Sequence, residues 1–479
     1  MEKNRIYLPA GIAGLLVICI YAWFISIGPW RTRGYTSDYY YQLATSFQHG
    51  QLSLETRPDP ALLALPDPYD LKARKGIPVV GDASLYEGRY YLYFGPFPSL
   101  VLAVIANIFP VKTGDQAFVY IFIGGLFCVQ SLLFLAIFRR FFSDLPNGII
   151  PLGILILGLT GPFARMLTHP FIHEAAISGG QFFATAGFYF AFLALKEKPI
   201  KHWKLLAAGI LWSCSISTRI TQLVPISVMV VITWLFIFNE NRKLKLDSKL
   251  GSATLALIAP LLLCGVLLAW YNWARFDSLF EFGLYYQLAG FNLQANYPSL
   301  FSDVYIIQNI YNYFLNPFEM RGSFPFAYAV AGTENPVFPF YELPRLYAVE
   351  GKFAGLLYST PFLIFSISPL LILIIRCTTM FKPGNKKDNL CNFFDWTAFS
   401  LIGSFIAGSI PILLLFYVGF RYETEFITSL SMLGLIGFCQ GWLLLRGTTA
   451  GQLFAWSGIG LAVFSVLVNI ALAFTGRTG

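Results

Sequence analysis

Long apolar runs alternate with short polar connectors along most of the chain. A transmembrane helix needs about 20 apolar residues and can extend into its flanks, so these runs predict about eleven membrane-spanning helices. The runs lie near residues 7–28, 118–138, 149–163, 175–195, 205–214, 221–238, 253–270, 353–375, 396–417, 426–445 and 454–474. Two polar segments, 29–98 and 272–352, interrupt the alternation. We therefore expect an all-α integral membrane protein, a helix bundle with two large loops on one side.

This pattern divides the chain into consecutive parts. We expect an N-terminal span (1–29), a first loop with juxtamembrane helices (30–114), a transmembrane core (115–273), a second large loop (274–352) and the C-terminal transmembrane helices (353–479). The second loop is rich in aromatic residues, Asn and Pro. A disordered segment would carry far fewer aromatics, so the composition favours an ordered lid over the first loop.

Composition agrees with the membrane class. The chain is 56% hydrophobic and only 12% charged, whereas soluble domains carry about 25% charged residues. The net charge of +8 does not indicate a nucleic-acid partner, because the lysines form short clusters between apolar runs, where membrane orientation explains them. Most of the seven cysteines lie inside apolar runs, which is typical of small buried residues rather than of disulfides or a zinc site.

The basic connectors predict the orientation, because connectors rich in Lys and Arg stay in the cytoplasm. They lie at 139–140, 196–204, 242–249 and 376–387. With these inside, both large loops and the C-terminus are extracytoplasmic and the N-terminus is cytoplasmic. This assignment requires the short apolar run at 99–109 to lie on the outer membrane face without crossing.

Ionisable residues recur at the predicted outer ends of the spans. They are Asp38, His173, Glu174, Arg219, Arg275 and Arg421. Charged groups at membrane depth are costly and are usually paired or functional. Arginines beside carboxylates suit a phosphate or pyrophosphate together with a hydroxyl that must lose its proton. This combination indicates group transfer from a phosphate.

Several short sequence motifs resemble those of uncharacterised bacterial members of the GT-C superfamily of polytopic membrane glycosyltransferases. They are Asp-Ala-Ser-Leu-Tyr at 82–86, Tyr-Phe-Gly-Pro-Phe-Pro at 93–98, Arg-Phe-Asp-Ser-Leu-Phe-Glu-Phe-Gly at 275–283 and Arg-Tyr-Glu-Thr-Glu-Phe at 421–426. The aspartate behind the first span and the aromatic-rich first loop are similar as well. The superfamily includes protein O-mannosyltransferases, the aminoarabinose transferase of lipid A and oligosaccharyltransferase.

The resemblance implies a sugar donor on a polyprenyl phosphate or pyrophosphate, and a lipid, glycan or protein acceptor outside the membrane. It implies Asp38 as the base for the acceptor, with Glu174 assisting the site or a divalent metal. In the family, an acidic residue or histidine often follows the first aspartate; here Tyr39 follows, so the metal requirement stays open. The expected substrate-binding residues are Arg219, Arg275, Arg421, Tyr422, Asp82, Tyr39, Tyr86 and His173.

Each of these residues also has a structural interpretation. Asp38 could be a solvated residue at the end of the first helix or a cap for the following loop. Glu174 could cap the fourth span, since an acid favours a helix N-terminus. The arginines could anchor in lipid headgroups, and the tyrosines could form the aromatic belt of the interface. Histidines four residues apart, such as His169 and His173, more often line a loop than bind a metal.

The sequence therefore predicts a glycosyltransferase of a bacterial inner membrane, contributing to the cell envelope. The alternatives are a flippase or transporter of lipid-linked sugars, a polysaccharide polymerase or ligase, and a non-catalytic membrane assembly factor. A flippase would place polar residues along the middle of its spans and show inverted repeats. Here the charges gather at span ends on one side, which favours the enzyme.

Overall fold

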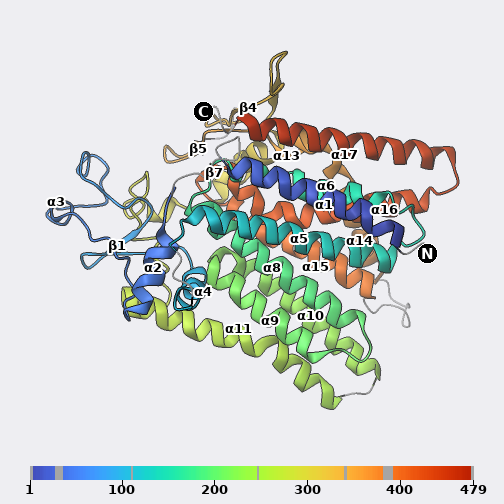
Figure 1. The fold of residues 1–479 in the computed structure, drawn as a ribbon, viewed down its shortest axis with the longest axis horizontal. Helices are drawn as coiled ribbons and strands as arrows, with labels where there is room; N and C mark the ends of the chain where they lie inside the picture. Colours follow the sequence, from blue (N-terminus) through green and yellow to red (C-terminus); the bar gives the residue numbers. More distant parts are fainter. Residues whose placement is uncertain are drawn as a thin grey trace.

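Long helices, running roughly along one direction, form the body of the protein (Figure 1). The structure is a computed structural model that describes residues 4–26, 36–108, 112–244, 247–338, 342–380 and 392–475. Among these residues, eight helices are long and apolar enough to cross a membrane. They are α1 (Asn4–Ile25), α5 (Asp115–Phe141), α8 (Ile172–Lys196), α10 (Leu223–Leu244), α11 (Asp247–Phe276), α15 (Phe393–Leu413), α16 (Thr424–Leu444) and α17 (Thr449–Thr475).

Three shorter helices run beside them: α6 (Ile149–Leu159), α9 (His202–Thr218) and α14 (Ile367–Met380), the last preceded by the 3-10 turn η5 (Pro361–Ser366). The expected helical membrane bundle is thus confirmed. The number of spans stays a prediction.

One predicted helix begins later than its apolar run. Residues 353–360 do not continue the helix of α14 but form β6 (Lys352–Phe353) and the short helix α13 (Leu356–Ser359). The backbone N–H of Gly355 donates to the carbonyl of Asn316 at 2.7 Å, and Phe353 pairs with Val330. Pairing with the second loop therefore overrides the apolar pattern in this stretch.

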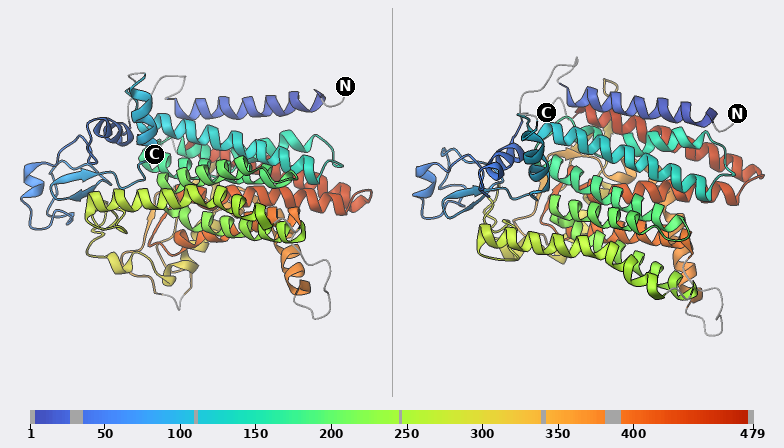
Figure 2. Two further views of the ribbon diagram at one scale, coloured as in Figure 1. Left: turned by 90° about the horizontal axis from the view of Figure 1, so that it is seen from below. Right: turned by 60° about the horizontal axis from the view of Figure 1, so that its bottom comes forward.

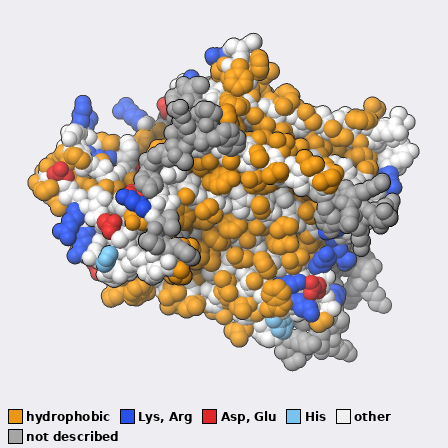
Figure 3. Space-filling view, viewed as in Figure 1, with side chains coloured by type: hydrophobic (Ala, Val, Ile, Leu, Met, Phe, Trp, Pro, Cys, Tyr) orange, Lys and Arg blue, Asp and Glu red, His pale blue; other side chains and the backbone are white. Residues whose placement is uncertain are grey.

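Burial separates the centre of the bundle from its lipid-facing surface. Helix α16 lies at the centre and is buried along most of its length. Helix α11, in contrast, exposes a row of large apolar side chains, among them Leu262, Val266 and Trp270. Figure 3 shows the resulting hydrophobic surface over the helices, with Lys and Arg gathered toward both ends. This is the surface that a protein surrounded by lipid needs.

Both polar segments gather at one end of the bundle, which we call the loop end (Figures 1 and 2). The first segment contributes α2 (Tyr39–Gln48), α3 (Pro60–Leu63), β1 (Ser84–Tyr86), β2 (Arg89–Tyr91) and α4 (Phe97–Ala106). The second contributes η2 (Tyr297–Ser299), η3 (Asp303–Tyr305), α12 (Ile306–Ile310), η4 (Tyr311–Leu315), β3 (Phe318–Met320), β4 (Ala327–Ala331), β5 (Ala348–Glu350) and β6. The opposite end carries Arg139 and Arg140 in the last turn of α5.

Helix α4 includes most of the apolar run at 99–109, which the predicted orientation places on the membrane face without crossing. Its ten residues extend about 15 Å, roughly half of the ~30 Å hydrocarbon core, so it is too short to cross. It packs against α2 at the loop end.

The loop end also contains short strands, which the sequence pattern did not predict. Strands β1 and β2 form an antiparallel hairpin, β3, β4 and β6 form a three-stranded sheet, and β5 pairs in parallel with β7 (Tyr417–Gly419). The two loops are also bonded to each other. The N–H of Leu85 donates to the carbonyl of Tyr286, and that of Leu288 donates to Ala83, both at 2.9 Å. The second loop therefore lies over the first as one ordered layer.

Candidate functional site

A cavity of about 670 Å³ lies at the loop end, between the two loops and the ends of the helices. Its walls come from the first loop, the second loop, the start of α8, the 3-10 turn η1 (Ile220–Gln222), β7 and the 3-10 turn η6 (Phe420–Glu423). Its lining is apolar in large part, including Phe171, Phe291 and Phe416, but it also holds several charged side chains. Its volume suits a small ligand.

Asp82 faces this cavity from the first loop. Its backbone has φ +57°, in the left-handed region that costs energy for residues other than glycine, and its N–H donates to the carbonyl of Leu288 at 3.0 Å. His173 Nε2 lies 3.2 Å from Asp82 Oδ2, and Gln287 Nε2 donates to Asp82 Oδ1 at 3.1 Å. Burial alone would raise the pKa of Asp82, but bonds from His173 and Gln287 and the charges of His173 and Arg421 hold it below its ordinary value. Asp82 is therefore an ionised carboxylate at neutral pH.

Arg421 lies on η6 between two carboxylates. Its Nη1 donates to Glu350 Oε1 at 2.6 Å and Oε2 at 2.5 Å, and it lies 4.0 Å from Glu174 Oε1. Glu350 comes from the second loop, where the parallel pair of β5 and β7 places Glu350 opposite Gly419. Glu174 also accepts a hydrogen bond from the backbone N–H of Phe171 at 3.1 Å and so caps α8.

Arg219 lies at the end of α9 and is buried beside α16. Its Nε donates to Glu425 Oε1 at 2.9 Å, and the hydroxyl of Thr221 donates to the same oxygen at 3.0 Å. Gln222 donates to the other oxygen of Glu425. The ring of Tyr422 contacts both arginines, with the guanidinium carbons of Arg219 and Arg421 at 5.8 and 5.2 Å from its centre.

A third arginine in the cavity, Arg165 on α7 (Phe163–Met166), was missed as a candidate. Its guanidinium lies 4.3 Å from the centre of the Phe420 ring, and its Nη2 donates to the carbonyl of Lys352. Burial lowers its pKa to about 10 despite the nearby charges of Glu423 and Glu350, so it stays cationic at neutral pH. The available signal was a basic residue between two apolar runs, on the side that the sequence predicts to be outside.

The structure brings most of the predicted site residues to one place. Those that line the cavity are Asp82, His173, Glu174, Arg219, Arg421 and Tyr422. They come from segments up to about 340 positions apart in the chain. Residues can act together in a reaction only if the fold brings them to one site, as it does here. The remaining candidates, Asp38, Tyr39, Tyr86 and Arg275, are not among the cavity-lining residues.

Asp38 immediately precedes α2 and does not cap that helix. Asp115 does so instead: its Oδ2 accepts from Ser37 Oγ at 2.6 Å and from the N–H of Tyr39 at 3.0 Å. The Asp38 carboxylate accepts a hydrogen bond from Gln42 Nε2 at 2.7 Å. Burial is the main cause that raises the pKa of Tyr39. The negative charges of nearby carboxylates, among them Asp82 and Asp38, raise it further. Asp38 therefore lies near the site but outside the cavity wall.

Tyr39 and Tyr86 connect parts of the loop layer. The hydroxyl of Tyr39 donates to the carbonyl of Gly81 at 2.6 Å, next to Asp82. The hydroxyl of Tyr86 donates to Asp277 Oδ2 at 3.1 Å and so joins the first loop to the end of α11. Both contacts position the first loop.

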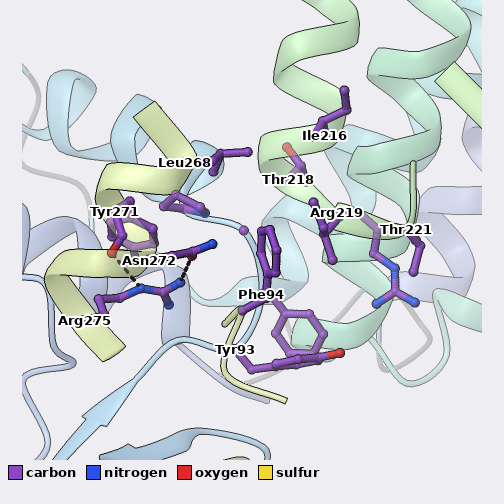
Figure 4. Close-up of a pocket in the computed structure, with 14 residues that line it drawn as sticks. Tyr93, Phe94, Ile216, Thr218, Arg219, Thr221, Leu268, Tyr271, Asn272 and Arg275 are labelled. Atoms are coloured by element: carbon purple, nitrogen blue, oxygen red, sulfur yellow. Dashed lines mark hydrogen bonds between the residues drawn. The ribbon is translucent and has the colours of Figure 1, made fainter. Parts of the chain in front are cut away.

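Arg275 lines a smaller neighbouring pocket of about 30 Å³, shown in Figure 4. It lies on the opposite side of that pocket from Arg219, with Phe94 between them. Its guanidinium donates to the carbonyl of Leu92 and to Asn272 Oδ1, each at 2.8 Å, and stacks 3.9 Å from the centre of the Tyr271 ring. These contacts hold the first loop against α11.

A metal site was left open by the sequence. Within the described ranges, no three His, Cys, Asp or Glu side chains are grouped closely enough to hold a metal ion. Among those same residues, Asp82 and His173 form a pair without a third such ligand.

Comparison with solved structures identifies the fold. The chain is similar to the oligosaccharyltransferase of Archaeoglobus fulgidus in the apo form, with 12% identity and a TM-score of 0.53 over 98% of this chain. It also matches ArnT from Cupriavidus metallidurans bound to undecaprenyl phosphate, with 12% identity and a TM-score of 0.42 over 100% of this chain and 77% of ArnT. No protein-family model and no curated protein matches it in sequence.

The chain spans 56% of the length of that oligosaccharyltransferase. The likeness shows that this chain shares the fold of that oligosaccharyltransferase, one of the proteins that the sequence resemblance named.

Proposed function

We propose that this protein transfers a sugar from a phosphate-linked polyprenyl donor to a hydroxyl of an extracytoplasmic acceptor. The observation that carries the proposal is the shared cavity at the loop end, where three arginines and the pair of Asp82 and His173 face one space. The fold supports the proposal by analogy, because an oligosaccharyltransferase has the same architecture. The acceptor is a lipid, a glycan or a protein, and the protein resides in a bacterial inner membrane with the loop end outside.

The arginines hold the phosphate of the donor in this proposal. Arg165, Arg219 and Arg421 line the cavity from three different elements, and the proposal assigns their guanidiniums to the donor phosphate. As the bond between the sugar C1 and the phosphate oxygen breaks, its electron pair stays on the phosphate. Fixed positive charge stabilises that developing charge most effectively in a site that excludes water.

Asp82 takes the acceptor proton. The acceptor oxygen attacks C1, and its proton passes to the Asp82 carboxylate, which His173 and Gln287 orient. The sequence suggested Asp38 for this role, but Asp38 does not line the cavity, and general-base chemistry needs contacts of about 3 Å. Of the carboxylates that line it, Glu174 and Glu350 lie within 4.0 Å of Arg421, whereas Asp82 pairs with His173. Glu174 positions Arg421 and the start of α8.

The test measures transfer of radiolabelled sugar from a polyprenyl-phosphate donor pool in membranes. We expect Asp82→Asn to lose at least about 100-fold in rate, the usual contribution of a general base. Asp38→Asn is the paired variant, and Asp144→Asn is the matched control, because Asp144 is exposed and follows α5 at the opposite end of the bundle.

The transfer rates of the two variants show which aspartate is the base. Loss in Asp82→Asn with transfer retained in Asp38→Asn supports the base proposed here. The reverse pattern returns the role to Asp38. If the wild type labels no acceptor but speeds donor lipid across the bilayer, the protein is a flippase and the enzyme proposal is wrong.

A further inference from the structure

A hairpin of the second loop exposes a group of large apolar side chains. Strands β3 and β4 form this hairpin, with Met320 opposite Ala327. Met320, Phe324 and Phe326 are 68%, 65% and 53% exposed, and the rings of the two phenylalanines lie 6.2 Å apart. We call these three residues the hairpin tip. Neighbouring apolar side chains that face outward mark an interaction surface, whereas single ones do not.

One face of the hairpin packs against the last turns of α17, a candidate membrane span. Ala327 and Ala329 of β4 are buried together with Val468 and Leu472 of that helix. The 27 residues of α17 extend ~40 Å, whereas the hydrocarbon core is ~30 Å thick. Val468 and Leu472 both lie within about 10 Å of the end of the helix at Thr475. Strand β4 therefore lies near the level where hydrocarbon gives way to headgroups.

The hairpin projects sideways from the bundle, past the surface of α17, at the top of the view in Figure 1. The ring of Phe324 lies 5.0 Å from that of Phe474 near the end of α17, and Phe474 lies 5.0 Å from Phe24 at the end of α1. Along α17, Phe464 and Leu467 are exposed on the surface of the bundle. Figure 3 shows hydrophobic side chains on the projection as well as on the helices below it. The hairpin tip thus continues the lipid-facing surface of the bundle.

The polar groups of the hairpin suit headgroups rather than hydrocarbon. Arg321 Nη2 lies 2.6 Å from Glu319 Oε2, and its guanidinium carbon lies 4.5 Å from the centre of the Tyr328 ring. Within the sheet that the structure describes, β3 is an edge strand that pairs with β4 alone. Charged groups and an unpaired strand edge are costly in hydrocarbon but find partners among headgroups and water. Aromatic side chains are enriched at that same level.

The hairpin is also held at a fixed height relative to the helices. The N–H of Arg321 donates to the carbonyl of Phe326 at 2.8 Å and closes the turn. At the other end of β4, Ala331 pairs with Lys352 of β6, whose carbonyl accepts a hydrogen bond from Arg165 of the cavity. The sheet therefore connects the hairpin tip to the wall of the cavity.

We propose that the hairpin tip binds the phospholipid interface of the leaflet at the loop end, with Phe324 and Phe326 among the headgroups and upper acyl carbons. The partner is the bilayer that surrounds the helices. Amphipathic interfacial segments bury their apolar face about 5–10 Å into the boundary between headgroups and acyl chains, a depth that two phenylalanine rings can reach. The membrane then supports the second loop from outside the bundle.

The experiment measures the depth of a fluorophore attached to the hairpin. Nitrobenzoxadiazole is coupled to Ser323→Cys, at an exposed position between Met320 and Phe324, in the full-length protein with its seven native cysteines replaced. The protein is reconstituted in phosphatidylcholine vesicles with or without bromine on the upper acyl carbons. We expect bromine to remove at least about half of the emission, because the label lies at the depth of the bromines.

Arg89→Cys is the matched control, because Arg89 is exposed at the start of β2, in the hairpin that lies beyond the ends of the helices (Figure 1). Its label should lose less than about a tenth of its emission, since it lies in water. A second variant, Phe324→Ser with Phe326→Asn, removes both rings from the tip. Asn tolerates the backbone of position 326, where φ is +73°. In this variant we expect quenching of the Ser323→Cys label to fall at least about threefold.

Thermal unfolding verifies that each variant is folded. If the variant without the two rings fails to fold, the comparison of the labels at positions 323 and 89 still tests the proposal. Equal quenching at both positions, or quenching at neither, overturns it, as does unchanged quenching in the folded variant without the rings. Energy transfer between labelled copies without quenching by bromine assigns the tip to a second copy of the chain and also overturns the proposal.

Discussion

Replacing Glu425 with Leu should destabilise the protein strongly, because it leaves Arg219 buried without its partner. Glu425 is 4% exposed and accepts from Arg219 at 2.9 Å, from Thr221 at 3.0 Å and from Gln222. Breaking a buried ion pair by removing one partner costs about 3–5 kcal/mol. Since three donors lose their acceptor at once, we expect a loss of about 4 kcal/mol in the free energy of unfolding.

The assay is equilibrium unfolding in mixed micelles, applied to a double-mutant cycle. The variants are Arg219→Leu, Glu425→Leu and the pair together. The double variant should lose less stability than the sum of the two single variants, because it leaves no buried charge unpaired. Glu319→Ala removes the exposed pair with Arg321 and should cost less than about 1 kcal/mol. A loss below about 1 kcal/mol in Glu425→Leu, or strict additivity in the cycle, would refute the argument.

Three further predictions concern pH, packing and loop attachment. The folded-state pKa of Asp82 is lowered, so its contribution to stability is present above its unfolded pKa of about 4 and is lost as the pH falls through the folded value. The difference in stability between wild type and Asp82→Asn should therefore shrink as the pH falls below about 4 and vanish in strong acid. Gly437→Ala should cost about 2–3 kcal/mol, because the new Cβ would overlap the carbonyl of Phe365, whereas Gly460→Ala meets open space and should cost nothing in the same unfolding assay. Asn309→Ala removes the donor to three carbonyls at and just after the end of α15, so limited proteolysis should cut the second loop faster while the helices resist.

Hydrophobic patterning located the helices, because a segment that crosses lipid must satisfy its backbone internally and cover it with apolar side chains. The apolar runs matched α5, α8 and α16 to within a few residues. The same logic placed Glu174, Arg219 and Arg421 at helix ends, where the structure also has them. Local sequence is sufficient for such features, since each depends on a residue and its immediate neighbours.

The partners of those charges came only from tertiary structure. Glu350 meets Arg421 across 71 positions, and Glu425 meets Arg219 across 206. Asp115, rather than Asp38, caps α2 because α5 begins beside it. Packing of the second loop decided that Asp82 lines the cavity and that residues 353–360 leave the helix. No periodicity in a single chain encodes which distant side chains will meet, since that depends on how helices and loops pack.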